Sequence, residues 1–388
     1  MYNFDNLLNR FGTNCVKWDM LEKKFGTTDM IPMGIADMDF ECLPEIMEVL
    51  VERAKHPTYG YTVATDGYYN AIINWNKTRN DFEFTKEQII PIPGCVAATT
   101  FALQALTNVG DKVMLHTPIY HPFYASIKDS GRETVMCEMK QDENLIYRID
   151  WEDMEAKLKD PKLTLLILCS PHNPCGRVWE REELEKIVDL CDKHHVKIFS
   201  DEIHSDIIMP GHKHIPLLAL NEKARKIGVL AAAPSKTFNI AGIKSSFYVI
   251  QDEELFNKVN NFYKTYHIGL DLFGYAATEA AYTKGAQWVD EMCAYIHENA
   301  KTVVDFCTKN TKIKAFVPQA TFLMFLDFSA YGLTHEEVAE KCIKAGVDMN
   351  SGVMFGKEGG NCHMRMNIGT PRHMVQKALE RLHAEFDK

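Results

Sequence analysis

Short runs of apolar residues alternate with helix-like segments through the middle of the chain, from about Lys112 to Gln251. The runs include KVMLH, TLLILC, KIFS and VLAAA, and the segments between them include HPFYASIKDSG and REELEKIVDLCDKHH. A run that stays apolar without alternating, such as Leu163–Cys169, is typical of a strand that is buried on both faces of a sheet. The pattern therefore predicts an α/β fold around a largely parallel sheet.

Beyond this region the spacing of apolar residues becomes helical. It predicts helices over Asp252–Tyr266, Tyr275–Lys284 and Ala286–Asn310. Nearer the C-terminus the two patterns alternate again: TFLMFLDF and CHMRMNI are strand candidates, and THEEVAEKCIKAG is a helix with Thr334 as its cap and Gly346 as its stop. We therefore expect a second, smaller α/β unit.

Composition and charge exclude several function classes. The chain has 388 residues, of which 46% are hydrophobic and 25% charged, which is ordinary for a globular protein of two or three domains. The formal net charge of −10 gives no electrostatic reason to bind nucleic acid. No apolar stretch approaches the ~20 residues that span a bilayer, and the first residues lack the apolar core of a signal peptide, so we expect no membrane association.

The cysteines suggest a reducing compartment. There are eleven, spread from Cys15 to Cys362, and no two form a C-x-x-C pair. An odd, dispersed set indicates neither a disulfide framework nor a zinc site. We expect a cytoplasmic protein with free thiols and no metal.

Polar side chains follow several of the apolar runs, at the edge where open α/β sheets bind their ligands. Taken singly, each has an ordinary structural explanation: Asn173 favours a turn, Asp201 a cap or an ion pair, and Lys236 a solvated loop. Their joint occurrence is what points to a site. The candidates, in chain order, are Gly94, Cys95, Val96, Ala97, Tyr120, Asn173, Asp201, His204, Ser235 and Lys236.

Pyridoxal 5′-phosphate (PLP) is a cofactor that needs such a set in one crevice. It requires a lysine for covalent attachment, a carboxylate facing its pyridinium nitrogen, and donors to its phosphate at a helix N-terminus. Lys236, Asp201 and the loop 94–97 supply these groups. Tyr120 is placed to stack on the ring of the cofactor.

Further residues fit the rest of the cofactor and an amino-acid substrate. Asn173 and His204 are placed to hydrogen-bond the phenolic oxygen of PLP. The α-carboxylate of an amino acid is held best by a bidentate arginine, and Arg365 is the candidate. The sequence therefore predicts a PLP enzyme that acts on an amino acid.

Six motifs carry a resemblance to a known family, and it covers essentially the whole chain. They are MGIADMDF, HPTYGYT, SPHNPCGRVW, DEIHSD, SKTFNIAGIK and RMNIGTPR, in the family's order. The chain resembles the class I/II aminotransferase superfamily of fold type I. More specifically, it looks like the cystathionine β-lyase, or C–S lyase, subfamily of the MalY/PatB type.

The resemblance implies an architecture. We expect a large PLP-binding domain with a mostly parallel seven-stranded sheet flanked by helices, and a smaller α/β domain. The implied division is an N-terminal arm over residues 1–45 that belongs to the small domain, the large domain over 46–280, and the rest of the small domain over 281–388. A homodimer with shared active sites is also implied, in which Tyr59 reaches the phosphate in the neighbouring subunit.

The resemblance also assigns residue roles. Ser235 and Lys244 contact the phosphate, and Ala36 of the IADMD segment lines the substrate side together with Asn173 and Arg365.

The implied reaction is elimination of a thiol from a sulfur amino acid, which leaves pyruvate and ammonia. Lys236 removes the α-proton, Asp201 keeps the cofactor's ring nitrogen protonated, and Tyr120 completes the catalytic set. Two alternatives stay open, because residue types alone do not decide between them. One is an aminotransferase on the same scaffold, and the other is a regulatory protein-binding role on the same fold.

Three departures from the family pattern concern the surroundings of the site. Ala233 stands where a serine is frequent, Gly34 stands where many relatives have an aromatic residue, and Ser351 stands where proline usually precedes the glycine. None removes a catalytic group. The change at Gly34 is expected to enlarge or reshape the substrate pocket.

Overall fold

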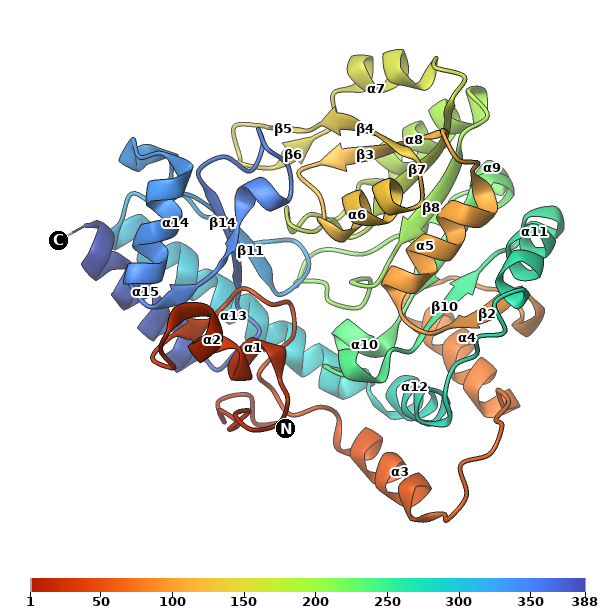
Figure 1. Cartoon of the computed structure of the whole chain (residues 1–388), viewed down its shortest axis with the longest axis horizontal. Helices are drawn as coiled ribbons and strands as arrows, with labels where there is room; N and C mark the ends of the chain where they lie inside the picture. The colour runs from red at the N-terminus through yellow and green to blue at the C-terminus, as the bar shows by residue number, and fades with distance from the viewer. Residues whose placement is uncertain (1, 388) are drawn as a thin grey trace.

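The computed structural model describes residues 2–387 and has a seven-stranded sheet at its centre (Figure 1). The strand order is β2-β10-β9-β8-β7-β3-β4. Only β10 runs antiparallel to its neighbours within this sheet, so the predicted largely parallel sheet is confirmed. The strands are β2 (Ile89–Ile92), β3 (Lys112–Thr117), β4 (Glu133–Glu138), β7 (Leu163–Cys169), β8 (Lys197–Asp201), β9 (Gly228–Ala232) and β10 (Ser246–Val249).

Helices cover both faces of this sheet, and β7 shows why its sequence does not alternate. Leu165 and Ile167 pack with the helices on one face, whereas Leu166 and Leu168 pack with those on the other. A strand covered on both sides has no face left for polar residues. The first face carries α5 (Cys95–Leu106), α6 (Pro122–Asp129) and α11 (Glu253–Lys264), and the second carries α7 (Trp151–Leu158), α8 (Arg181–Lys193) and α9 (Glu222–Ile227).

A smaller, antiparallel sheet of order β11-β14-β13 forms the second α/β unit. Residues from both ends of the chain meet beside it, because β1 pairs in parallel with β12 and Lys24 forms an ion pair with Asp348 at 2.8 Å. Figure 1 shows the N-terminal helices α1 and α2 beside this part. The elements are α1 (Val16–Asp19), α2 (Leu21–Phe25), β1 (Ile31–Pro32), β11 (Leu323–Asp327), α14 (His335–Lys344), β12 (Val347–Asp348), β13 (Asn350–Ser351), β14 (His363–Asn367) and α15 (Arg372–Phe386).

The remaining helices link the two units. The helix α12 packs against α3 and α4, and the 25-residue helix α13 continues from α12 to a contact with α15 (Figure 1). Among residues 2–387, no helix is long and apolar enough to cross a membrane. The bounds are α3 (Pro44–Lys55), α4 (Asp66–Asn80), α10 (Pro234–Thr237), α12 (Leu272–Lys284) and α13 (Ala286–Asn310); a short hairpin joins β5 (Lys140–Gln141) to β6 (Tyr147–Arg148).

The helix predictions hold to within two residues except at one start. The helix α13 has the predicted bounds, and the side chain of Thr334 caps α14 by accepting a hydrogen bond from Glu337 N. The prediction that α12 begins at Tyr275 is wrong. The carboxylate of Asp271 accepts a hydrogen bond from Gly274 N at 2.8 Å, and this cap starts the helix three residues earlier.

Candidate active site

A cavity of about 320 Å³ lies at the carboxyl ends of the parallel strands, where the sequence predicts the site. All the predicted site residues line it except Arg365 and Tyr59. The lining consists of Ala36, Pro93, Gly94, Cys95, Val96, Ala97, Tyr120, Cys169, Asn173, Asp201, Ile203, His204, Ser235, Lys236, Ala241 and Lys244.

One end of the cavity is built to hold an anion. Gly94, with φ +98°, is the N-cap of α5, so the first amide N–H groups of that helix have no partner within it and face the cavity end. Lys244 lies against Gly94: a Cβ on the glycine would be 3.7 Å from the Cβ of Lys244. The hydroxyl of Ser235 adds a donor. A helix N-terminus with a cation beside it suits a phosphate group.

Lys236 lies in the one-turn helix α10 and extends into the cavity. Its Nζ donates a hydrogen bond to the carbonyl oxygen of Ala36 at 2.6 Å. Burial lowers the pKa of the Lys236 ammonium, and the carboxylate of Asp37 opposes this shift. A lowered pKa raises the fraction of Lys236 in the neutral, nucleophilic amine form, which covalent attachment of PLP requires.

Asp201 ends β8 and is only 4% exposed. Its Oδ1 accepts a hydrogen bond from Ile203 N at 3.1 Å, and among the described residues it makes no ion pair. Burial raises the pKa of this carboxyl group to about 7. A buried carboxylate that lacks a cationic partner is suited to face the protonated ring nitrogen of PLP.

The same burial gives a testable stability effect in the cofactor-free protein. The pKa of Asp201 is higher in the folded state than in the unfolded chain, so its contribution to the free energy of unfolding is fully present below about pH 4. As pH rises from there to about 7, the folded protein loses stability by roughly 1.4 kcal/mol per pH unit. Asp201→Asn keeps the bond from Ile203 and has no charge to bury. We expect urea unfolding to show the variant gaining stability over wild type across this range.

A matched control is Asp189→Asn, which removes an exposed carboxylate paired with Lys223. This pair is on the surface and is worth little, so its pH dependence is expected to follow wild type. Equal pH slopes for the wild type and Asp201→Asn would contradict the assignment.

Three side chains surround the space left for the cofactor ring. Burial raises the pKa of Tyr120 to about 12, so its phenol is neutral. Burial lowers the pKa of His204 to about 3, and its Nδ1 is buried without a hydrogen-bond partner. Asn173 is 3% exposed and accepts a bond at Oδ1, which leaves its amide N–H groups to donate. An unpartnered ring nitrogen beside free amide donors fits the phenolic oxygen of PLP.

Arg365 is not among the residues that line the cavity, but it is hydrogen-bonded to Asn173, which is. Its Nη1 donates to Asn173 Oδ1 at 3.0 Å and its Nη2 to the carbonyl oxygen of Gly34 at 2.9 Å, while the buried Nε has no partner. The guanidinium carbon lies 4.7 Å from the ring centre of Phe355. Burial lowers the pKa of Arg365 to about 10, so it remains a cation near neutral pH.

Tyr59 is far less buried, and a single chain does not bring it into the cavity. Its side chain is exposed, and its hydroxyl donates to the carbonyl oxygen of Ala54 at 2.6 Å. Its contact with the phosphate of a neighbouring subunit stays a prediction.

Two of the three departures from the family pattern, Gly34 and Ser351, have local explanations. A Cβ on Gly34 would come 2.7 Å from Asn350 Oδ1, so a larger residue there requires Asn350 to move. Ser351 uses its hydroxyl in a 2.6 Å hydrogen bond with Nε2 of His335, an interaction that proline cannot make. Gly34 and Asn350 both lie beside Arg365, because the carbonyl oxygen of Gly34 accepts a hydrogen bond from Arg365 and Asn350 pairs with Arg365 across the small sheet. Neither Gly34 nor Ser351 lines the cavity, and the effect of Gly34 on the substrate pocket stays a prediction.

Sequence reasoning missed four residues of the lining: Pro93, Cys169, Ile203 and Ala241. Two of them had a usable signal, because Pro93 and Cys169 end or directly follow apolar runs. The other two lie inside the motifs DEIH and NIAGIK, but their apolar side chains carry no chemistry that would mark them. Among residues 2–387, no three His, Cys, Asp or Glu side chains gather in a way that could hold a metal.

A lysine, a buried carboxylate and an anion cradle around one cavity on this fold define a PLP-dependent enzyme of fold type I. Residues 28–382 match the family described as aminotransferase class I and II, and the chain belongs to that family.

Individual relatives of known description are similar to this chain over nearly its whole length. The chain is 42% identical to cystathionine beta-lyase PatB of Bacillus subtilis over 98% of its own length and 99% of that protein. The structure of cystalysin from Treponema denticola, which contains PLP, is similar with a TM-score of 0.95 and 33% identity over 99% of this chain and 98% of that one. A PLP-bound candidate aminotransferase from Clostridium difficile 630 has a TM-score of 0.96 and 39% identity over both whole chains.

These comparisons confirm the predicted family, the fold type and the PLP cofactor. The roles of individual site residues and the domain boundaries stay predictions.

Proposed function

We propose that this protein is a PLP-dependent carbon–sulfur β-lyase that converts a sulfur amino acid into a thiol, pyruvate and ammonia. One observation carries the proposal: the chain is 42% identical to a cystathionine beta-lyase over nearly its full length, and its cavity keeps the lysine, the carboxylate and the anion cradle. Fold alone would not identify the reaction.

Some residues of the site transfer or hold protons, and others bind the substrate. When bound, PLP supplies an electron sink that acidifies the α-C–H bond of the substrate. Lys236 takes the α-proton, and its lowered pKa suits that role. Asp201 holds a proton at the ring nitrogen, and Arg365 with Asn173 orients the α-carboxylate of the substrate.

An aminotransferase is the second candidate, because the family and one PLP-bound structural relative carry that description. Both reactions begin with removal of the same α-proton, but only transamination needs a keto-acid acceptor. With L-cystathionine and no added keto acid, we expect the PLP-loaded enzyme to release pyruvate and a thiol in equal amounts. Amino transfer that requires an acceptor, with no pyruvate in its absence, would favour the rival.

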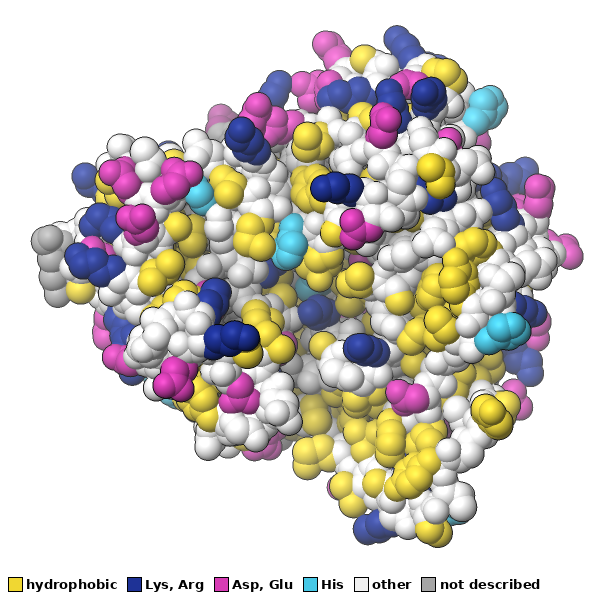
Figure 2. Space-filling model, in the orientation of Figure 1, with side chains coloured by type: hydrophobic (Ala, Val, Ile, Leu, Met, Phe, Trp, Pro, Cys, Tyr) yellow, Lys and Arg dark blue, Asp and Glu magenta, His cyan; other side chains and the backbone are white. Residues whose placement is uncertain are grey.

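We also propose that the active unit is a homodimer with shared sites. Figure 2 shows apolar side chains gathered on the side where Figure 1 places α3, α5 and α12. Met47 and Val51 of α3 are exposed, and so is Tyr59, which follows this helix in the chain. Val96 lines the cavity and is also exposed, so the cavity adjoins this face. Sedimentation that gives a monomer mass for the active enzyme would refute the dimer.

The remaining proposals concern organisation and compartment. We propose a large domain of residues 46–280 and a small domain made of residues 1–45 and 281–388. The pairing of β1 with β12 supports this division, because it joins the two parts of the small domain. All eleven cysteines are free thiols, which supports a cytoplasmic location.

A further inference from the structure

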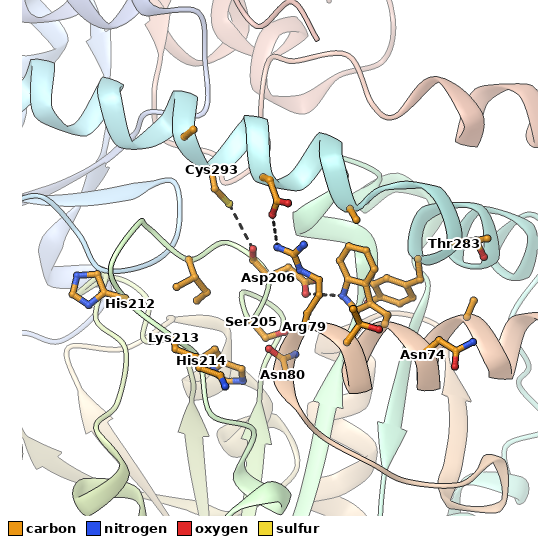
Figure 3. A pocket seen from close by; sticks show the side chains of 18 of the residues that line it. Asn74, Arg79, Asn80, Ser205, Asp206, His212, Lys213, His214, Thr283 and Cys293 are labelled. Carbon is orange, nitrogen blue, oxygen red and sulfur yellow. Dashed lines mark hydrogen bonds and ion pairs between the residues drawn. The ribbon is translucent and has the colours of Figure 1, made fainter. Parts of the chain in front are cut away.

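A second cleft, of about 1060 Å³, lies between α4, α13 and the segment 205–214 (Figure 3). In the described part of the chain it shares no lining residue with the cofactor cavity. Asp206 lies on its floor and is nevertheless only 6% exposed. A buried carboxylate outside the active site calls for a reason, because its desolvation is costly.

Asp206 joins three helices. Its Oδ1 accepts a hydrogen bond from Trp75 Nε1 of α4 at 2.8 Å, and its Oδ2 accepts one from Thr237 Oγ1 of α10 at 2.9 Å. Its carbonyl oxygen accepts a hydrogen bond from Cys293 Sγ of α13 at 3.6 Å, as Figure 3 shows. The carboxylate therefore connects α4 to the short helix that carries Lys236, while the main chain of the same residue contacts α13.

The carboxylate is held by neutral donors and not by a cation. Among the described residues Asp206 makes no ion pair. The nearby Arg79 pairs instead with Asp290 at 2.9 Å, and its guanidinium lies over the Trp75 ring. Burial raises the pKa of Asp206, while the bond from Trp75 and the charge of Arg79 oppose that shift. The buried carboxylate of Asp206 is costly in desolvation, but it accepts hydrogen bonds from two buried donors, the Thr237 hydroxyl and the Trp75 indole N–H, which would otherwise lack a partner.

The helix α10 cannot hold its own orientation. It has four residues and its N-cap, Ala233, offers no side-chain acceptor, so it depends on tertiary contacts. Successive helical residues point about 100° apart, and Thr237 directly follows Lys236. With the fully buried Thr237 fixed toward Asp206, Lys236 is turned into the cofactor cavity.

We infer that Asp206 is a positioning residue, which acts through the hydroxyl of Thr237 to fix the rotation of α10 and so to hold Lys236 Nζ at the cofactor and the substrate. The part that concerns catalysis rests on the proposed lyase function. The part that concerns cofactor attachment rests only on PLP binding.

The test is Thr237→Val, which keeps the shape of the side chain and removes the bond to Asp206. We expect the lysine-linked cofactor, followed by its absorbance band, to form about tenfold more slowly when PLP is added to the cofactor-free variant. In turnover, kcat is expected to fall about tenfold with KM within about twofold of wild type. The isotope effect on kcat with α-deuterated substrate should rise, because proton transfer to a displaced lysine becomes slower.

Two further variants separate positioning from general damage. Thr107→Val removes a hydroxyl that is also buried, but at the far end of α5, where it donates to Leu103 O and accepts from Arg132 Nε. This variant should leave all three readouts unchanged. Asp206→Asn can still accept from Trp75 and can donate to the Thr237 hydroxyl, so it should retain the rates that Asp206→Leu loses.

Attachment rate and isotope effect in Thr237→Val equal to those in Thr107→Val would overturn the inference. If wild type releases no pyruvate, the proposed function fails, and the attachment rate still decides the role of Asp206.

Discussion

Replacing Lys236 by alanine is expected to abolish release of pyruvate from a sulfur amino acid, with a loss of about 10⁴-fold or more. Lys236 supplies the amine for cofactor attachment and the base for the α-proton, so one substitution removes both. Lys244, the other lysine of the lining, lies at the anion end beside Gly94 and cannot take over either role from there. Absorbance of PLP-loaded protein and a pyruvate assay measure the two losses separately.

Lys244→Ala is the matched control for a lost lysine in the same cavity. It should weaken retention of PLP during gel filtration but keep the absorbance of the lysine-linked cofactor at saturating PLP. Turnover by Lys236→Ala at the rate of wild type would remove the basis of the proposed mechanism.

The sequence was sufficient to predict the parts of the fold that depend on local pattern. The run at Leu163–Cys169 is apolar because both faces of β7 are covered, and that requirement is visible residue by residue. The start of α12 was missed because it depends on one side chain, Asp271, which closes a cap onto Gly274 N. Apolar spacing carries no information about such a cap.

The site was predictable where its residues follow strands. Asp201 and Lys236 come soon after apolar runs, and parallel strands bring their carboxyl ends to one edge of the sheet. The contact between Arg365 and Asn173 spans 192 positions and depends on how the smaller sheet packs against the larger one. Asp206 was missed for the same reason, since its role comes from three helices that meet only in the folded chain.

Arg365→Lys is expected to lower kcat/KM for a sulfur amino acid roughly 30- to 5,000-fold, the equivalent of about 2–5 kcal/mol for a lost buried charge contact. The guanidinium has enough donors to bond Asn173 and Gly34 and still present its unpartnered Nε and remaining N–H groups to a carboxylate. A lysine has one nitrogen on a flexible stem and cannot do all three. The loss should appear mainly in KM, with the absorbance of bound PLP unchanged.

An amine substrate analogue without the α-carboxylate makes this prediction specific. Its affinity, measured by competition, should be nearly the same for wild type and Arg365→Lys, because the analogue has nothing for the guanidinium to hold. Arg372→Lys is the control for an arginine change elsewhere, since Arg372 lies over Tyr295 and is only half-buried. If Arg365→Lys weakens the analogue as much as the amino acid, Arg365 shapes the cavity through Asn173 and does not bind the substrate carboxylate.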